Sequence, residues 1–372
     1  MQFSFWELKN WFTKVDYTIV GSGIVGLHCA LQLRDKYPSA KILILEKGVL
    51  PQGASTKNAG FACFGSVSEI VDDLRSHTEE DVLQLVQKRW DGLQLLRRRI
   101  GDELLDLKPF GGYELFLKEE ESTYHECLQQ LPFINELLKP LFKNEVFSKE
   151  VNRFAFQGIQ DCVLFNPYEA QIDTGNMIQY LLKLAIQQDV LILNQQTVTS
   201  YVEKREGVEV VLGDFSFSTN KLLFATNGFA GEITKGEVKP ARAQVLITKP
   251  IPNLEIKGTF HLDKGYYYFR NFENRILLGG GRNLDFEGET TTSLEQTERI
   301  QNKLEQLLTN VILPNQAFEI EQRWSGIMGV GKQKTPIVKQ LAENVYCGVR
   351  LGGMGVAIGS SVGKELADLI KQ

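Results

Sequence analysis

A strand, a glycine-rich turn and a helix start follow one another near the N-terminus and constrain the fold more than any other feature. The turn reads Gly21-Ser22-Gly23-Ile24-Val25-Gly26 and follows a β-branched stretch that ends at Val20. In this pattern the first glycine permits a tight turn, the second lets backbone N–H groups approach a pyrophosphate, and the third lets helix and strand pack closely. The helix N-terminus adds partial positive charge for phosphates. The pattern predicts a dinucleotide site; a turn that binds nothing is the alternative.

A second apolar strand supports this interpretation. It runs from Lys41 to Leu45 and is followed by Glu46 and Lys47. Glu46 comes about 20 residues after Gly26, the spacing at which an acid accepts hydrogen bonds from a ribose 2′-OH. We therefore expect an unphosphorylated adenosine ribose at Glu46.

Composition limits the classes of function. The net charge of −5 argues against general nucleic-acid binding, which requires a basic face. The five cysteines are scattered and never form a C-x-x-C pair, so we expect reduced thiols, no metal site and a cytoplasmic protein. No stretch is long and apolar enough to span a bilayer. Residues 1–14 are aromatic-rich and amphipathic, and we expect a helix that packs on the protein rather than on a membrane.

The order of the segments indicates two interleaved domains rather than two consecutive ones. With 372 residues, the chain exceeds what one hydrophobic core usually organises. Pieces typical of a nucleotide fold lie at 15–75, 165–235 and 323–372, and strand-rich segments at 76–164 and 236–322 interrupt them.

Two further loops carry chemistry suited to a flavin dinucleotide. The first contains Ala54, Ser55, Thr56, Asn58, Ala59 and Gly60, whose hydroxyl, amide and backbone donors suit a ribityl chain and a pyrophosphate. The second, Gly352-Gly353-Met354-Gly355-Val356, lies between a buried strand and the last helix. Backbone N–H groups at a helix start can face an anion, such as the pyrimidine edge of a reduced flavin. A polar surface loop and a simple strand–helix turn are the alternatives.

Taken in order with Ala225-Thr226-Asn227-Gly228 and Trp324-Ser325-Gly326, these motifs resemble the D-amino-acid oxidase family of FAD-dependent oxidoreductases. That family includes glycine oxidase, sarcosine oxidase and γ-glutamylputrescine oxidase. The resemblance extends from about Asp16 to Leu369. It implies an α/β (α+β) fold, in which a Rossmann-like FAD-binding domain is interleaved with an antiparallel-sheet substrate domain. It also implies that the Val198 backbone touches the adenine and that Thr226, Asn227 and Gly228 close over the phosphates.

The resemblance implies oxidation of a small amine or amino acid. Hydride would pass from the α-carbon to flavin N5 and leave an imine, and O2, a quinone or another carrier would take the electrons. We expect non-covalent FAD, because no cysteine lies in Ser325–Lys334 and no histidine in Ser55–Lys57. Cys63 and Cys347 are expected to be packing thiols.

One departure from the family concerns the substrate carboxylate. Met328 stands where amino-acid-oxidising members often carry an arginine. Arg350 is our first candidate for a replacement, because it ends the strand that leads into the second glycine loop; Arg270 and Arg282 are weaker candidates. Tyr266 and Tyr268 alternate on one predicted strand, so both are candidates for the pocket wall. Met354 is expected at the reacting centre.

Three other functions stay open. A 2-hydroxyacid dehydrogenase on this fold requires a histidine base near the flavin, and the C-terminal half has only His261. An RNA-modifying flavoprotein predicts a basic surface, which the acidic balance opposes. A non-catalytic flavin scaffold is the third. The sequence does not indicate the substrate, the electron acceptor or the oligomeric state.

Overall fold

The computed structural model describes residues 3–371 and is built on two large sheets. The first sheet has eight strands in the described chain, and its main path runs β17-β18-β11-β1-β2-β8, with β10 and β9 added beyond β11. Strands β1, β2, β8, β11 and β18 are mutually parallel where they pair. The bounds are β1 (Val15–Val20), β2 (Ile42–Leu45), β8 (Leu191–Leu193), β9 (Ser200–Lys204), β10 (Gly207–Leu212), β11 (Phe215–Phe224), β17 (Ile337–Ala342) and β18 (Val345–Val349).

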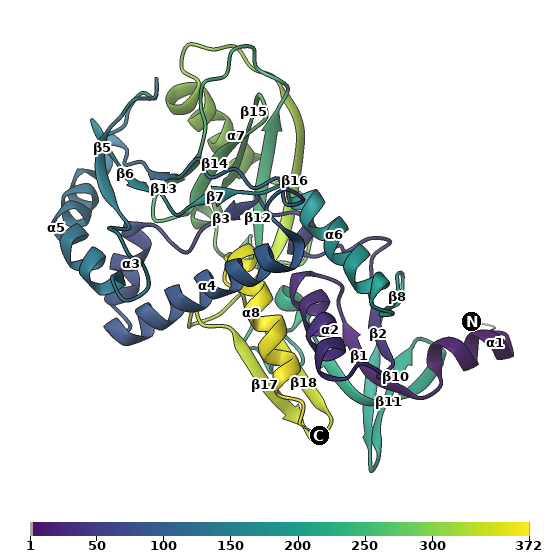
Figure 1. Cartoon of the computed structure of the whole chain (residues 1–372). Helices are drawn as coiled ribbons and strands as arrows, with labels where there is room; N and C mark the ends of the chain where they lie inside the picture. The colour runs from purple at the N-terminus through teal and green to yellow at the C-terminus, as the bar shows by residue number, and fades with distance from the viewer. Residues whose placement is uncertain (1–2, 372) are drawn as a thin grey trace.

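Helices cover one face of this sheet and a hairpin covers the other. On the helical face, alternate strand residues such as Ile19 and Ile44 pack against α2, α4, α6 and α8. On the opposite face Leu43 and Leu45 pack beside the β9–β10 hairpin. Successive side chains of a strand point to opposite faces of the sheet, and here both faces are buried. Figure 1 shows α8 (yellow) beside α2 and α4. The helices are α2 (Ile24–Lys36), α4 (Glu79–Ile100), α6 (Thr174–Gln187) and α8 (Gly355–Asp368).

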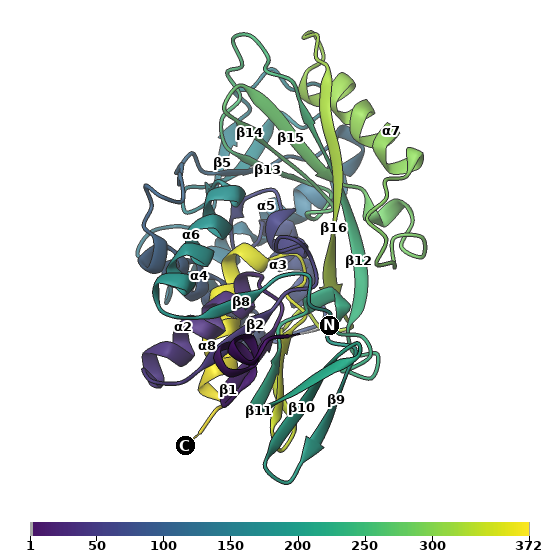
Figure 2. The ribbon, with the colours of Figure 1, turned by 90° about the vertical axis from the view of Figure 1, so that its right-hand side faces the viewer.

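The second sheet also has eight strands among the described residues, ordered β16-β12-β15-β14-β13-β4-β6-β5. All its pairs are antiparallel except β13 with β4. Figure 2 shows β12 and β16 running from the upper part of the molecule, beside α7, down toward the first sheet. The bounds are β4 (Gly112–Glu114), β5 (Ser148–Val151), β6 (Cys162–Asn166), β12 (Lys239–Thr248), β13 (Thr259–Leu262), β14 (Tyr267–Phe272), β15 (Arg275–Gly280), β16 (Ile320–Val330) and α7 (Glu298–Leu307).

Smaller elements join the two sheets. A two-stranded ribbon pairs β3 (Phe61–Ala62) with β7 (Ala170–Gln171). Helices α3 (Val67–Leu74) and α5 (Glu121–Leu138) pack on each other and bury their own apolar cluster. A further small cluster, built around Ala59, Val245 and Leu277, lies between the second sheet and the loop that precedes β3.

The predicted fold class is confirmed, with a parallel sheet under helices and a largely antiparallel second sheet. The predicted domain limits do not coincide with the sheets everywhere. Strand β16 begins before residue 323 and pairs along its length with β12, and β6 crosses residue 165. The division into two interleaved domains stays a prediction.

The N-terminal segment packs on the first sheet along one side only. It forms α1 (Phe5–Glu7) and a π-helical turn, η1 (Leu8–Phe12). Phe12 is buried against Phe215 and Phe217 of β11, as expected for packing on the protein. Phe5 and Trp6 are 69% and 65% exposed, which the expectation did not foresee.

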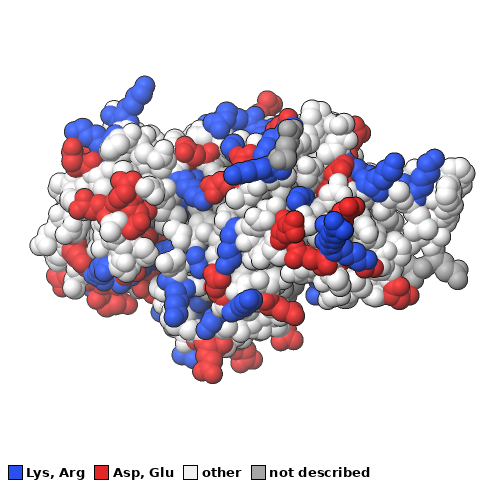
Figure 3. All heavy atoms as spheres, turned by 90° about the horizontal axis from the view of Figure 1, so that it is seen from below, with Lys and Arg blue, Asp and Glu red and all other residues white. Residues whose placement is uncertain are grey.

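The described surface carries both signs of charge. Viewed from below, Lys and Arg side chains are interspersed with Asp and Glu, without a continuous basic stripe on this face (Figure 3). Among residues 3–371, no helix has both the length and the apolarity that crossing a bilayer requires.

Candidate functional site

A cavity of about 1010 Å³ lies between the two sheets. The last residues of β1, β2 and β11 line its floor, as expected where the carboxyl ends of parallel strands meet at one edge. Residues of the second sheet, including Val245 and Tyr268, line the opposite wall. The volume is at the upper end of the usual range for ligand pockets, so the cavity has room for a large ligand.

The structure brings most of the predicted cofactor contacts to this cavity. Those that line it are Gly21, Gly23, Ile24, Val25, Glu46, Lys47, Ala54, Ser55, Asn58, Ala59, Gly60, Val198, Thr226, Asn227, Gly352, Gly353, Met354, Gly355 and Val356. Ser22, Gly26, Thr56 and Gly228 are not among the lining residues.

The glycine turn needs its glycines for close approach. Gly21 has a φ of +104°, and a Cβ there would lie 2.9 Å from the Ala225 carbonyl oxygen. A Cβ on Gly26 would lie 1.9 Å from the Gly21 oxygen, so α2 could not start so near β1. The predicted packing role of Gly26 therefore agrees with its position outside the cavity.

Glu46 is a buried carboxylate fixed by several donors. Its oxygens accept hydrogen bonds from the backbone N–H of Ser22 (3.0 Å) and Gly48 (2.9 Å) and from the Ser22 hydroxyl (2.8 Å). Ser22 does not line the cavity and is bonded to Glu46, so the contact it makes in the structure is with Glu46; its predicted cofactor contact stays a prediction. Hydrogen-bond donors to the ionised form compensate for the burial of its charge.

The loop before β3 is organised by its own polar side chains. The Ser55 hydroxyl oxygen accepts from the Ile24 backbone N–H at 3.0 Å, which ties this loop to the start of α2. Asn58 donates to the Ser55 carbonyl (2.9 Å) and accepts from the Gly60 N–H (2.8 Å). The Thr56 hydroxyl donates to the Pro51 carbonyl at 2.7 Å, and Thr56 does not line the cavity; its predicted cofactor contact stays a prediction.

Arg270 fastens the same loop to the second sheet. It is buried on β14, and its guanidinium donates to the carbonyls of Ala59 and Ile172. Burial lowers the Arg270 pKa to about 10, which still leaves the group charged at neutral pH. Because it does not line the cavity, its weaker candidacy as a substrate anchor is not supported.

The second glycine loop meets the Thr226–Gly228 segment beside the cavity. The Asn227 side-chain oxygen accepts from the Leu351 backbone N–H at 3.1 Å and so joins the two loops. Gly352 and Gly353 have φ of +58° and +86°, a conformation that favours glycine. Gly228 is buried, and a Cβ there would lie 2.5 Å from the Met328 oxygen, so its role is close packing rather than contact.

Arg350 is not directed into the cavity, which corrects our first candidate for the substrate anchor. It has a φ of +66°, and its Nε donates to the Thr335 carbonyl at 2.9 Å. Burial lowers the Arg350 pKa, and the negative charge of Glu237 offsets this only in part. Arg350 is absent from the lining residues, whereas Leu351 and Gly352 are present.

Both predicted tyrosines line the cavity. Tyr268 lies on β14, and Tyr266 immediately precedes that strand. Burial raises the pKa of Tyr268 to about 12, so its hydroxyl stays protonated and can donate a hydrogen bond. Arg282, at the start of the short turn η5 (Arg282–Leu284), also lines the cavity.

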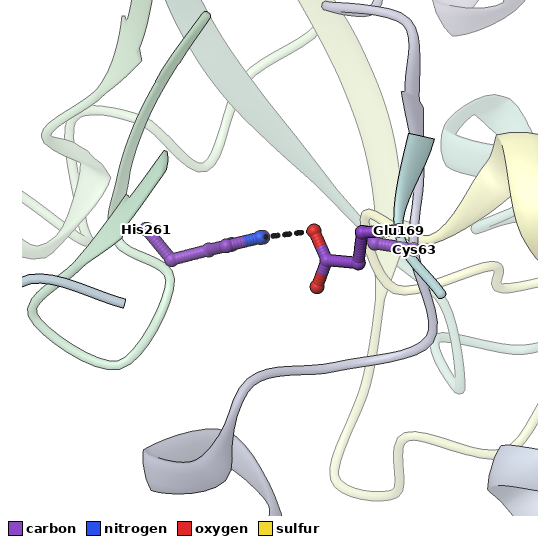
Figure 4. Close-up of side chains that lie close together, drawn as sticks. All are labelled: Cys63, Glu169 and His261. Atoms are coloured by element: carbon purple, nitrogen blue, oxygen red, sulfur yellow. Dashed lines mark hydrogen bonds and ion pairs between the residues drawn. The ribbon is translucent and has the colours of Figure 1, made fainter. Parts of the chain in front are cut away.

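A buried ion pair at the cavity wall was missed by the sequence reasoning. His261 lines the cavity, and its Nε2 lies 2.9 Å from a Glu169 carboxylate oxygen (Figure 4). Burial alone lowers the His261 pKa, but Glu169, with Glu69 and Glu114, raises it to about 9. The imidazole is therefore held as an imidazolium at neutral pH. The sequence offered one indication of this site. Thr259 and His261 are two residues apart on a strand, so their side chains lie on the same face and can bond to the same partner.

Cys63 completes a cluster with this pair. One atom each of Cys63, Glu169 and His261 lie within 4.8 Å of one another, a spacing compatible with metal ligands. The Glu169 oxygen already accepts from His261 and, at 2.8 Å, from the Thr259 hydroxyl. A metal ion bound to His261 Nε2 would break the bond between His261 and Glu169, so the arrangement favours a hydrogen-bonded pair. The Cys63 sulfur lies 3.8 Å from that of Met354, which connects the cluster to the second glycine loop.

Comparison with known proteins identifies the family. A family model described as FAD dependent oxidoreductase matches residues 16–369. The chain belongs to this family. A curated relative, a probable oxidoreductase OrdL from Haemophilus influenzae, is 20% identical over 95% of this chain and 82% of its own length.

Solved structures share the fold at low sequence identity. Glycine oxidase from Geobacillus kaustophilus superposes with a TM-score of 0.76 at 16% identity, over 96% of each chain. L-Proline dehydrogenase from P. horikoshii gives a TM-score of 0.74 at 17% identity, over 96% of this chain and 93% of its own. Iminodiacetate oxidase from Chelativorans sp. gives 0.75 at 18% identity, over 94% of each.

The cavity of this FAD-dependent oxidoreductase family member fits the cofactor. The glycine turn removes side chains where a pyrophosphate must approach, and Glu46 directly follows β2, where a ribose is expected. The loop before β3 and the second glycine loop open into the same cavity. The residues that would hold FAD therefore form one continuous surface.

Proposed function

We propose that the protein oxidises the C–N bond of a small amine or amino acid to an imine, using non-covalent FAD. The observation that carries this proposal is one continuous cavity, which joins the predicted FAD surface to Tyr266, Tyr268 and Met354. When bound, FAD supplies a two-electron acceptor for hydride. The protein contributes binding, orientation and exclusion of water.

The wall beside the second glycine loop supports an apolar reaction chamber. Met328, Ile327 and Met354 line it together with the Tyr268 ring. Met328 lies over the loop, since its sulfur is 3.4 Å from the position of a Cβ on Gly353. Such surroundings favour the neutral form of an amine over the ammonium ion. The neutral amine retains the lone pair that makes hydride loss from the adjacent carbon easier.

His261 bears on the hydroxyacid alternative. Oxidation of an alcohol needs a general base for the hydroxyl proton, and His261 is the histidine that lines the cavity in the described chain. Because Glu169 raises its pKa to about 9, the ring is protonated at neutral pH and cannot act as that base there. The ion pair therefore favours the amine reaction near neutral pH.

The test is anaerobic reduction of the flavin in the purified holoprotein. Amines, D- and L-amino acids and 2-hydroxyacids of matched size are mixed in turn with the holoprotein. The loss of the absorbance of oxidised flavin is followed for each. We expect bleaching by members of the first two classes and none by the hydroxyacids at pH 7. Bleaching by hydroxyacids alone would refute the proposal.

The non-covalent attachment has a separate test. Denaturation followed by filtration should release FAD, because the Cys63 sulfur packs against Met354 and no histidine lies in the Ser55–Lys57 segment. Flavin that stays with the precipitated polypeptide contradicts this part of the proposal.

A further inference from the structure

Several positively charged side chains line the cavity, and they differ in their partners. Lys264 lies 3.5 Å from an Asp72 carboxylate oxygen. Lys334 lies 2.5 Å from one of Asp73. The imidazolium of His261 is neutralised by Glu169, as described above.

Arg282 is different, because no carboxylate of the described chain lies within ion-pair distance of it. Burial lowers the Arg282 pKa, and the nearby Tyr266 and Glu289 offset this only in part. The Glu289 carboxylate accepts two hydrogen bonds from the Arg242 guanidinium, at 2.8 and 2.6 Å. The Gln244 side chain donates a further bond to Glu289 at 3.0 Å. Glu289 is therefore paired with Arg242, and Arg282 has no carboxylate partner of its own in the described chain.

The chain is shaped to hold Arg282 at the cavity wall. Gly280 and Gly281 precede it with φ of +123° and +80°, and a Cβ on Gly280 would lie 2.0 Å from the Tyr266 oxygen. The guanidinium lies over the Phe286 ring, 4.8 Å from its centroid. A cation stacked on an aromatic face keeps its N–H groups free in the plane of the guanidinium.

Arg282, Phe286 and Tyr266 form a cluster at the rim of the cavity. The Phe286 ring is 46% exposed, and it also contacts the Tyr266 ring, with 5.8 Å between centroids. The inner end beside the second glycine loop carries Met328 and Met354 instead. Burying a substrate carboxylate among these methionines is costly unless a cation pairs with it.

We propose that Arg282 binds a carboxylate which the substrate carries at a distance from the oxidised C–N bond. The substrate class is then an ω-amino acid or a similar amine with a remote anionic group, rather than an α-amino acid held by its α-carboxylate. This inference rests on the proposed amine oxidation for the position of the C–N bond. The carboxylate subsite itself depends only on Arg282 and its surroundings.

A binding experiment tests the subsite without turnover. Pentanoate and its neutral isostere pentanamide are titrated into the oxidised holoprotein, and the dissociation constants are read from the change in the flavin absorbance. We expect Arg282→Met to weaken pentanoate at least about tenfold, with pentanamide unchanged. Arg282→Lys should show a smaller loss, because lysine keeps the charge and loses the planar fork.

Arg205→Met is the matched control for loss of one positive charge. Arg205 is exposed in the turn between β9 and β10, away from the cavity-lining residues. This variant should bind pentanoate as the parent does. FAD content and far-UV circular dichroism establish that each variant is folded and loaded. The proposal is overturned if Arg282→Met keeps the parent affinity for pentanoate, or if the parent binds pentanoate no better than pentanamide.

A kinetic comparison separates this inference from the proposed function. We expect kcat/KM to be higher for γ-aminobutyrate and δ-aminovalerate than for glycine, alanine and butylamine, and Arg282→Met to remove the advantage over butylamine. If amines and α-amino acids reduce the flavin and Arg282→Met changes nothing, the subsite is wrong while the function stands. If no amine reduces the flavin but pentanoate binding depends on Arg282, the function is wrong while the subsite stands.

Discussion

Replacement of Glu169 by Gln tests the buried ion pair through the pH dependence of stability. Glutamine keeps the volume and an acceptor for the Thr259 hydroxyl but removes the negative charge beside His261. In the parent, the folded-state pKa of His261 is about 9, against an ordinary value of 6.5. In the variant the burial of His261 dominates, so its pKa should fall below the ordinary value.

The sign and size follow from proton linkage. A folded-state pKa raised above the unfolded value contributes stability that is fully present below pH 6.5 and is lost as pH rises through about 9. The difference of roughly 2.5 pH units corresponds to about 3 kcal/mol. Breaking a buried pair by removing one partner costs about 3–5 kcal/mol in other proteins, which is the same range.

Urea denaturation with saturating FAD, followed by far-UV circular dichroism at pH 6, 7.5 and 9.5, measures the effect. Glu169→Gln should lose about 3 kcal/mol relative to the parent at pH 6, and the loss should shrink at pH 9.5. Glu305→Gln, which removes a partly exposed partner of Arg323, serves as a control and should cost at most about 1 kcal/mol. An equal loss for Glu169→Gln at all three pH values would refute the argument.

Three further substitutions test the FAD surface. Gly26→Ala places a methyl group 1.9 Å from the Gly21 oxygen and should cost about 1–3 kcal/mol in urea denaturation; parental stability contradicts the packing argument. Glu46→Gln removes the charge expected to bind the ribose, and fluorescence titration of the apoprotein should show FAD affinity reduced about tenfold; unchanged affinity rules that role out. Arg270→Met removes the hydrogen bond to the Ala59 carbonyl and should weaken FAD binding by a similar factor. Pentanoate binding that depends on Arg282 should persist once the variant is reloaded with FAD. Parental FAD affinity would show that the bond from Arg270 to the loop is not needed for FAD binding.

Local sequence patterns predicted many of the residues that line the cavity. At Gly21 and Gly26 the backbone leaves no room for a Cβ, so only glycine fits there. This requirement is visible in the sequence as the spacing of the motif itself, namely the G-x-G-x-x-G pattern. Glu46 directly follows the buried strand β2, and its spacing from Gly26 was enough to predict its place at the cavity. Thr56 shows the limit of this reasoning, because a hydroxyl in a polar loop can serve the loop's own carbonyls as well as a ligand.

Residues brought together by the second sheet could not be found in the same way. Glu169 follows β6 and His261 lies on β13, and they become neighbours only because β4 pairs with both of these strands. No periodicity in the sequence encodes which strands pair across such a separation. The sequence therefore identified His261 as a lone histidine and could not supply its carboxylate.

The three arginines show most clearly what the order of residues leaves undetermined. Arg270 lies within β14, whereas Arg282 and Arg350 follow β15 and β18. The sequence ranked the three by their proximity to the second glycine loop. The side-chain direction follows instead from local backbone geometry and from the acceptors within reach. Arg350 has a φ of +66° and donates a hydrogen bond to the Thr335 carbonyl. Arg270 donates hydrogen bonds to the carbonyls of Ala59 and Ile172. Of the three, Arg282 is the one that lines the cavity, and no carboxylate of the described chain lies within ion-pair distance of it, which is why we assign the substrate carboxylate to Arg282.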